Sequence, residues 1–301
     1  MQILKSIVFV FSMVIGVVLV SACQKAAVDQ GSSAAPQGMV DSADGVSIHY
    51  KSIGQGDMTL LFVHGWCTDM SYWDAQIPSF KVYYQVVTLD LAGHGRSGAE
   101  RTEWTMDAFA RDVVAVAEKL DLHKVVLIGH ALAGPVVLEA ARLLPERVIG
   151  IIGVDSMSDI YLSAYSPEQI ETALSPFYQD FVEGIRLYAL ENYFRSTASD
   201  RLKRRIVMDM AETPADIGRG CLEELMKYDA TTTLQELKMP VRSINADRPL
   251  VYFRTIRRIH ENFTLKFMKN MGHFLMIENP QEFNRILADF LGQIILESYQ
   301  Q

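Results

Sequence analysis

The sequence lacks an excess of positive charge, a metal-binding pattern of histidines and internal repeats. Its 28 lysines and arginines are outnumbered by 36 aspartates and glutamates, which gives a formal net charge of −8. Proteins that bind nucleic acid usually carry a basic surface, so we expect no nucleic-acid partner. No metal site or other cofactor is expected either, because no metal-ligand spacing relates His64, His94, His123, His130 and His260, to which we assign structural roles.

Cysteine is scarce, with three in 301 residues. Beyond Cys23, the remaining Cys67 and Cys221 lie far apart in sequence. An exported compartment would permit a disulfide between them, but we expect two separate thiols. The length suits one large α/β domain, or one such domain with an inserted subdomain, rather than two independent domains.

The first 22 residues have the pattern of a secretory signal peptide. A short basic start, Met1–Lys5, precedes an apolar run, Ile7–Val20, that is near the lower length limit for a membrane-spanning helix. The following Val20–Cys23 (VSAC) resembles the lipobox of bacterial lipoproteins, which favours a cleaved signal over a transmembrane anchor. The resemblance implies that lipid on Cys23 holds the protein at a membrane surface.

Residues 23–42 are expected to be the lipidated cysteine and a flexible tether, because they are mostly small and polar. The protein is therefore expected to be exported and anchored to a bacterial membrane, on its periplasmic or cell-surface side. The globular domain is expected over residues 43–298.

From Gly45 onward, short β-branched runs alternate with amphipathic stretches, which predicts an α/β fold with a mostly parallel sheet flanked by helices. The clearest helix is Thr105–Leu120, with a polar start and one apolar face. The predicted strands are Thr59–Val63, Tyr84–Leu89, Val125–Ile128, Ile149–Val154, Val241–Ile244 and Thr264–Phe267.

Strand-like runs stop after Val154, and a helical cap is predicted over about residues 157–235. Aromatic side chains recur there, and we expect two or three of them at most to contact a ligand, because an aromatic stripe at helical spacing is more often core. The candidates are Tyr161, Tyr165, Phe177, Tyr178, Phe181, Tyr188, Tyr193 and Phe194.

Residues 129–134 (GHALAG) lie directly between a predicted strand and a helix that opens at Pro135. This is the setting of a nucleophile elbow, in which a Gly-x-Ser-x-Gly turn presents a serine at the tip of a strand. Here the first glycine is Gly129, the last small position is Ala133, and the serine position is Ala131.

Four segments in this order resemble the α/β-hydrolase fold superfamily, in its esterase and lipase-like branch, over about residues 45–295. The elbow is one, and residues 63–66 (VHGW) resemble the oxyanion loop. Residues 90–98 (DLAGHGRSG) resemble the loop after the next strand, and residues 272–274 (GHF) resemble the histidine segment. The resemblance implies an α/β-hydrolase fold with an inserted cap and a catalytic serine, acid and histidine.

In this scheme His273 is the base, and Asp247, which follows the strand Val241–Ile244, is the predicted acid. Many relatives place the acid a residue or two further on, so Asp155 after the strand Ile149–Val154 is the alternative acid. The backbone N–H groups of Trp66 and Leu132 are the expected oxyanion donors, by position alone.

Ala131 has no hydroxyl, so the acyl-enzyme route is closed in the chain as written. The parent form is expected to be a carboxylic ester hydrolase, with a small hydrophobic ester or lactone, macrolides included, as substrate. A deliberate replacement of serine by Ala131 is favoured over natural loss, because the other parts of the machinery are in place. The alternative is a natural, catalytically silent ligand-binding lipoprotein.

Overall fold

The structure is a computed structural model, and it describes residues 37–157, 162, 164–247 and 254–300. The expected signal peptide, the lipidation site Cys23 and most of the expected tether lie outside the described residues. The described residues form one compact unit. In the described part of the chain, no helix has the length and apolarity that crossing a membrane requires.

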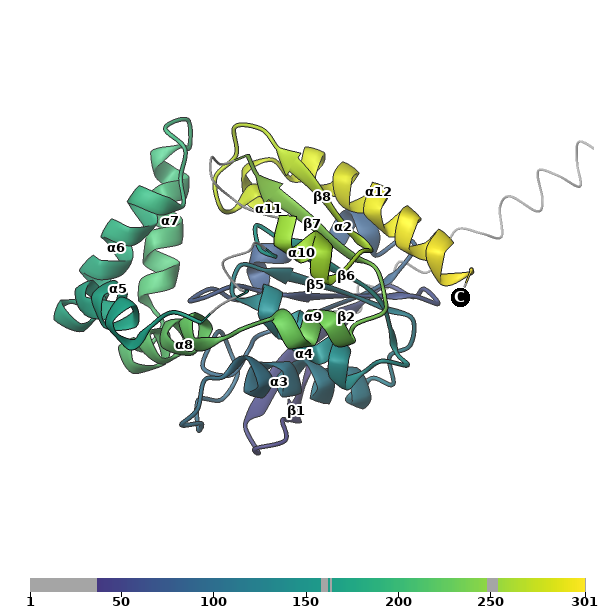
Figure 1. The fold of residues 1–301 in the computed structure, drawn as a ribbon, viewed down its shortest axis with the longest axis horizontal. Helices are drawn as coiled ribbons and strands as arrows, with labels where there is room; N and C mark the ends of the chain where they lie inside the picture. Colours follow the sequence, from purple (N-terminus) through teal and green to yellow (C-terminus); the bar gives the residue numbers. More distant parts are fainter. Residues whose placement is uncertain (1–36, 158–161, 163, 248–253, 301) are drawn as a thin grey trace, which may run out of the picture. The chain divides into compact units, whose positions relative to one another are not determined.

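The centre of this unit is an eight-stranded sheet with the order β1-β2-β4-β3-β5-β6-β7-β8 (Figure 1). β1 and β2 pair antiparallel, as do β2 and β4, and every other neighbouring pair is parallel. The strands are β1 Gln37–Asp41, β2 Ser47–Ile53, β3 Thr59–Val63, β4 Gln85–Leu89, β5 Val125–His130, β6 Val148–Val154, β7 Val241–Ala246 and β8 Phe263–Met268. The α/β-hydrolase fold predicted from the sequence is confirmed.

The two antiparallel strands were not predicted. β1 lies at the edge of the sheet and alternates between exposed and half-buried residues. Its pairing with β2 depends on backbone hydrogen bonds, which small polar side chains do not prevent. The expected tether therefore ends too late, because the sheet already begins at Gln37.

Helices cover both faces of the sheet (Figure 1). The central strands β3 and β5 are buried along their whole length, which explains their continuous apolar sequences. The helices of this part are α3 Met106–Lys119, α4 Ala133–Leu143 and α12 Pro280–Ser298, with the shorter η1 Met70–Trp73, α2 Ile77–Phe80, α9 Thr231–Glu236, α10 Arg254–Ile259 and α11 Leu275–Glu278.

Four helices between β6 and β7 form the cap, to one side of the sheet in Figure 1. They are α5 Pro167–Gln179, α6 Phe181–Asn192, α7 Asp200–Ala211 and α8 Ala215–Lys227. The first three begin at Ser166, Asp180 and Ser199, whose side chains accept hydrogen bonds from the first helical turn. The cap is shorter than predicted, because α9 packs on α4 and α10 of the sheet domain.

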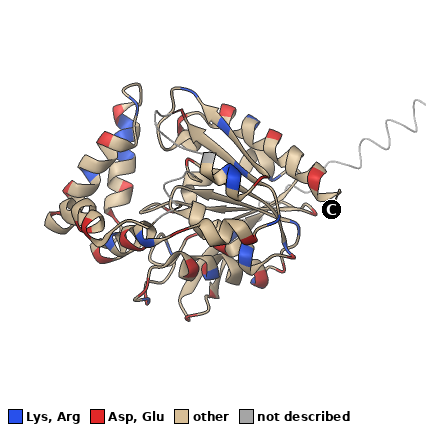
Figure 2. Cartoon of the chain, viewed as in Figure 1, with Lys and Arg blue, Asp and Glu red and all other residues tan. Residues whose placement is uncertain are grey.

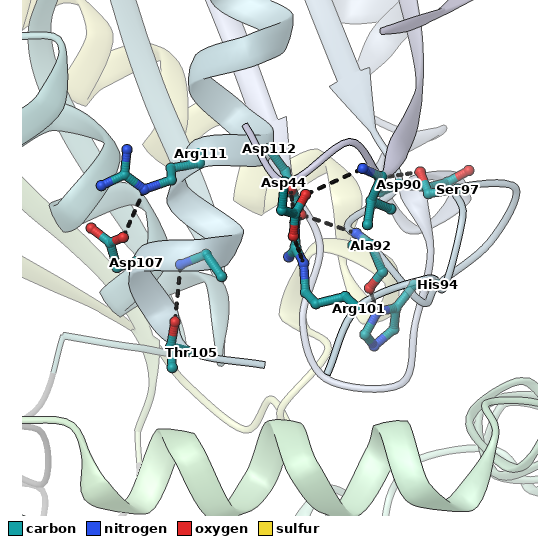
Figure 3. Close-up of polar contacts among 12 residues, drawn as sticks. Asp44, Asp90, Ala92, His94, Ser97, Arg101, Thr105, Asp107, Arg111 and Asp112 are labelled. Carbon is teal, nitrogen blue, oxygen red and sulfur yellow. Dashed lines mark hydrogen bonds and ion pairs between the residues drawn. The ribbon is translucent and has the colours of Figure 1, made fainter. Parts of the chain in front are cut away.

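Charged residues of both signs are interspersed along the helices (Figure 2). One ion pair is nevertheless buried (Figure 3): Arg101 contacts Asp112 at 2.5 Å, and it also contacts the exposed Asp44 at 2.6 Å. Burial raises the pKa of Asp112, although the guanidinium of Arg101 opposes that shift. Asp112 also accepts the N–H of Ala92, so the ion pair holds the loop after β4 against α3.

Candidate active site

The turn between β5 and α4 has the backbone of a nucleophile elbow. Ala131 has a φ of +50°, a left-handed conformation that costs an L-residue about 1–2 kcal/mol. Three hydrogen bonds hold the turn: the Ala131 N–H donates to Val154 O at 3.0 Å, and its carbonyl accepts from the Gly134 N–H and the Ser156 hydroxyl, both at 2.9 Å. The turn is thus fixed by its neighbours and not by alanine's own preference.

Two glycines allow the close packing around this turn. A Cβ on Gly129 would lie 2.4 Å from the carbonyl oxygen of Ala133. A Cβ on Gly134 would lie 1.8 Å from the hydroxyl oxygen of Ser156, in the segment that follows β6. The second glycine-requiring position is therefore Gly134, one residue beyond the small position expected from the motif.

His273 forms a short contact with a carboxylate. Its Nδ1 donates to Oδ2 of Asp155 at 2.5 Å, and the two side chains are only 10% and 7% exposed. Asp155 directly follows β6, and its other oxygen accepts the backbone N–H of Ala246 at the end of β7, at 3.0 Å. The carboxylate is therefore held between two neighbouring parallel strands and faces the imidazole.

Asp247, the acid favoured from the sequence, does not occupy this place, and the structure instead pairs His273 with the alternative, Asp155. The reason is that β7 continues to Ala246. The Asp247 N–H donates to Met268 O, so Asp247 extends the pairing with β8, and it is exposed.

The loop that carries His273 is tied to the elbow through His130. The Nε2 of His130 donates to the carbonyl oxygen of His273 at 3.0 Å, and the two rings lie 4.5 Å apart. Burial lowers the pKa of His130 to about 3, which keeps the ring neutral. The structural role assigned to His130 therefore includes joining the elbow to the base.

The oxyanion loop passes beside position 131. A Cβ on Gly65 would lie 3.2 Å from the Cβ of Ala131. Among the described residues, neither the Trp66 N–H nor the Leu132 N–H has a hydrogen-bond acceptor, and Leu132 directly follows the elbow residue. Both donors predicted from the sequence are thus placed near the tip of β5 with their N–H groups uncommitted.

Two buried histidines shape this loop. His94 donates from Nδ1 to Ala92 O at 2.9 Å and accepts the Cys67 N–H at Nε2, at 3.3 Å. His64 donates to Gly65 O and accepts the Leu91 N–H, both at 2.9 Å. Burial lowers the pKa of both rings, to about 3 for His94, so both act as neutral donor and acceptor.

The oxyanion loop also contacts the cap. The indole Nε1 of Trp66 donates to Gly218 O in α8 at 2.7 Å, and its ring meets Phe177 of α5 edge-on at 5.5 Å. The Cys67 sulfur would lie 3.2 Å from a Cβ on Gly218, so Cys67 packs under the cap. Cys67 and Cys221 are both free and buried, and burial raises the pKa of each thiol.

The cap aromatics divide into contacting and exposed groups. Tyr193 stacks on His273 and Phe177 contacts Trp66, whereas Tyr178 is 62% exposed and Tyr161 lies outside the described residues. Tyr193 was one of eight candidates in the sequence, and nothing in the local pattern distinguished it.

The arrangement places an imidazole, a carboxylate bound to it and two backbone N–H donors around the methyl group of Ala131. Within the described ranges, no three histidine, cysteine or carboxylate side chains gather as metal ligands. The chemistry that these groups offer is proton transfer and stabilisation of an oxyanion.

Comparisons with known proteins concern the fold of the chain. The sequence profile described as alpha/beta hydrolase fold matches residues 59–204. A non-heme chloroperoxidase of Streptomyces lividans is 27% identical over 289 residues, covering 84% of this chain and 99% of that protein. The 3-oxoadipate enol-lactonase 2 of Acinetobacter baylyi is 26% identical over 255 residues, covering 81% of this chain and 92% of the lactonase.

A solved thermophilic esterase from Thermogutta terrifontis superposes with a TM-score of 0.75 at 21% identity, covering 86% of this chain and 99% of the esterase. At that identity the superposition supports the fold alone. Together with the strand order and the profile match over residues 59–204, it shows that the chain has the α/β-hydrolase fold.

Proposed function

We propose that this chain is a carboxylic ester hydrolase of the serine type in which alanine stands at the nucleophile position, so that it binds substrate and hardly turns it over. The observation that carries the proposal is the buried contact of 2.5 Å between His273 and Asp155. It occurs in the same structure as a left-handed elbow residue, Ala131. A histidine bound to a carboxylate can take the proton of a nucleophile, and a left-handed residue at the tip of a strand is the position from which that nucleophile is presented.

With serine at position 131, the reaction follows from the geometry. The serine oxygen attacks the ester carbonyl while the imidazole of His273 takes its proton, and Asp155 stabilises the imidazolium. The N–H groups of Trp66 and Leu132 receive the negative charge of the tetrahedral intermediate. His273 then protonates the leaving alcohol, and water releases the acid by the same steps. Removing such a serine lowers turnover by roughly 10⁶-fold.

Esters and lactones are the proposed substrates. The relatives include an enol-lactonase, and a solved esterase shares the fold. The cap brings aromatic side chains to the catalytic loops, which suits a hydrophobic acyl or alcohol group.

The test is hydrolysis of p-nitrophenyl esters of increasing chain length and of macrocyclic lactones. The chain as written and Ala131→Ser are compared at equal concentration, with Ala133→Ser as the control that places a hydroxyl two residues away in α4. We expect hydrolysis with Ala131→Ser only. If that variant stays inert while the ligands bind, the proposal fails and the chain is a silent ligand-binding protein.

We also propose that the chain is exported and lipidated at Cys23, since residues 20–23 resemble a lipobox. Lipid chains on this residue would anchor the protein by burying methylene groups, each contributing about 0.8 kcal/mol. Mass spectrometry of the protein extracted from bacterial membranes is expected to find diacylglyceryl-modified Cys23 at the N-terminus. Recovery of an unmodified chain that retains residues 1–22 would contradict this. So would a Cys23→Ser variant that is released from the membranes to the same extent as the parent protein.

A further inference from the structure

One short segment of the cap contacts the loop that carries the base. The carbonyl oxygen of Tyr193, directly after α6, accepts the His273 N–H at 2.7 Å. Two residues on, the Arg195 guanidinium donates to Met271 O at 3.2 Å. A Cβ on Gly272 would lie 2.3 Å from the Tyr193 oxygen, so glycine between the two loop contacts is what permits this approach.

The Tyr193 side chain adds a ring contact to these backbone contacts. Its ring is stacked on the His273 imidazole, with the centroids 4.3 Å apart and the planes 14° from parallel. Tyr193 also meets Phe274 edge-on at 5.6 Å, which fixes the tyrosine ring from the side. A flat ring at this distance occupies the space that the imidazole would need in order to rotate.

The same aromatic group reaches the oxyanion loop. Tyr188, in α6, lies 5.3 Å from Tyr193 and 6.2 Å from Trp66, both edge-on. A continuous series of ring contacts therefore runs from the base, through one cap helix, to the loop that supplies an oxyanion donor. A change in the position of α6 would therefore alter the ring contacts of both His273 and Trp66.

We propose that Tyr193 is a positioning residue that holds the His273 ring in its productive orientation, so that the seating of the cap determines whether the base is aligned. This inference rests on the proposed function. Asp155 fixes one edge of the imidazole through Nδ1, and the stacked tyrosine limits the tilt of the ring about that contact. A misplacement of about 1 Å in a catalytic group lowers turnover by roughly 100-fold.

The kinetic test uses the Ala131→Ser chain with p-nitrophenyl butyrate. Tyr193→Leu keeps the backbone carbonyl and removes the ring, and we expect it to lower kcat by about 10- to 100-fold with a small change in KM. Tyr193→Phe keeps the stack and is expected to retain kcat within about threefold. Tyr178→Leu is the matched control, because Tyr178 is an exposed tyrosine of the same cap. A rise in KM alone in Tyr193→Leu, or an unchanged kcat, would overturn the proposal.

A second readout does not depend on hydrolysis. In the chain as written, the Tyr193 ring is stacked on the His273 imidazole, so we expect the Cε1–H proton of His273 to give one sharp NMR signal shifted upfield. Tyr193→Leu is expected to remove that shift and broaden the signal through exchange between ring orientations, and Tyr193→Phe to preserve it. A sharp signal in the leucine variant overturns the positioning role. If Ala131→Ser is inert while the NMR differences appear, the proposed hydrolysis fails and the positioning role stands.

Discussion

Ala131 combines a small side chain with a left-handed backbone conformation that is unfavourable for alanine. Its φ of +50° persists because Val154, Gly134 and Ser156 bind both of its backbone polar groups. An elbow defined in this way belongs to the surrounding structure, so a serine introduced at position 131 inherits the geometry. The backbone conformation of the elbow therefore does not require a hydroxyl at position 131.

The identity of the acid gives a prediction at a single position. In the Ala131→Ser background, Asp155→Asn is expected to lower kcat by about 10⁴-fold, because the amide cannot stabilise the imidazolium or fix its tautomer. Asp247→Asn is the control and is expected to stay within about threefold, since Asp247 is exposed. Turnover rates of both variants with p-nitrophenyl butyrate decide between them, and the reverse ranking would assign the acid to Asp247.

Close packing behind the elbow gives a second prediction. Gly134→Ala is expected to lower the free energy of unfolding by about 1–3 kcal/mol, because the added methyl meets the Ser156 hydroxyl. Gly292→Ala in α12 is the matched helical control: nothing lies within 4 Å of its added Cβ, and it is expected to stabilise by about 0.5–1 kcal/mol. Urea unfolding measures both, and equal midpoints would refute the packing argument.

At the scale of single elements, α3 illustrates how the chain sets a helix boundary. Thr105 is extended, and its hydroxyl accepts the Ala108 N–H at 3.1 Å (Figure 3). Thr105→Ala is expected to reduce the unfolding free energy by about 1 kcal/mol, because that N–H loses its acceptor. Thr102→Ala, in the exposed loop before the helix, should change it by less than about 0.5 kcal/mol. Chemical denaturation followed by circular dichroism compares the two, and a similar loss in both would rule out the capping explanation.

Prediction from sequence succeeded for elements whose hydrophobic pattern reflects their burial. The run Thr59–Val63 was predicted with the bounds that the structure shows, because both of its faces are covered. β1 and β2 carry no such run, and their antiparallel pairing is decided by backbone contacts with neighbours.

In the candidate site, too, local sequence patterns predicted some parts and not others. The elbow and His273 follow local motifs, whereas the choice between Asp155 and Asp247 depends on where two neighbouring strands end. Val154 and Ile244 are paired in register, and β7 runs two residues past that pair. The contact of Tyr193 with the base depends on how the cap folds back, which no local pattern encodes.

At the scale of the whole molecule, buried neutral histidines predict sensitivity to acid. Burial lowers the pKa of His94 and His130 to about 3, whereas the unfolded chain binds these protons near pH 6.5. The unfolded state therefore binds more protons below about pH 6.5, and stability falls as the pH decreases from there towards 3. Each such histidine contributes a slope of about 1.4 kcal/mol per pH unit well below 6.5.

The measurement is the free energy of unfolding between pH 6 and pH 4.5. His130→Gln keeps a donor for the His273 carbonyl and removes one titrating group, so its slope should be shallower than the parent's by about 1.4 kcal/mol per pH unit. His123→Gln, at an exposed histidine, is the control substitution. Parallel curves for all three proteins would contradict the assignment.

Because Trp66 is hydrogen-bonded to the cap, its fluorescence reports on whether the cap is in place. Of the three tryptophans, Trp73 is buried in the sheet domain and Trp104 packs beside Gly220 of α8, whereas Trp66 donates its indole N–H to Gly218 O in the same cap helix. In a Trp73→Phe, Trp104→Phe chain, the emission spectrum would come from Trp66 alone. Water that reaches its indole would shift that emission to longer wavelengths. Lifting of the cap would therefore be detected as a red shift of the fluorescence, without a label or a substrate.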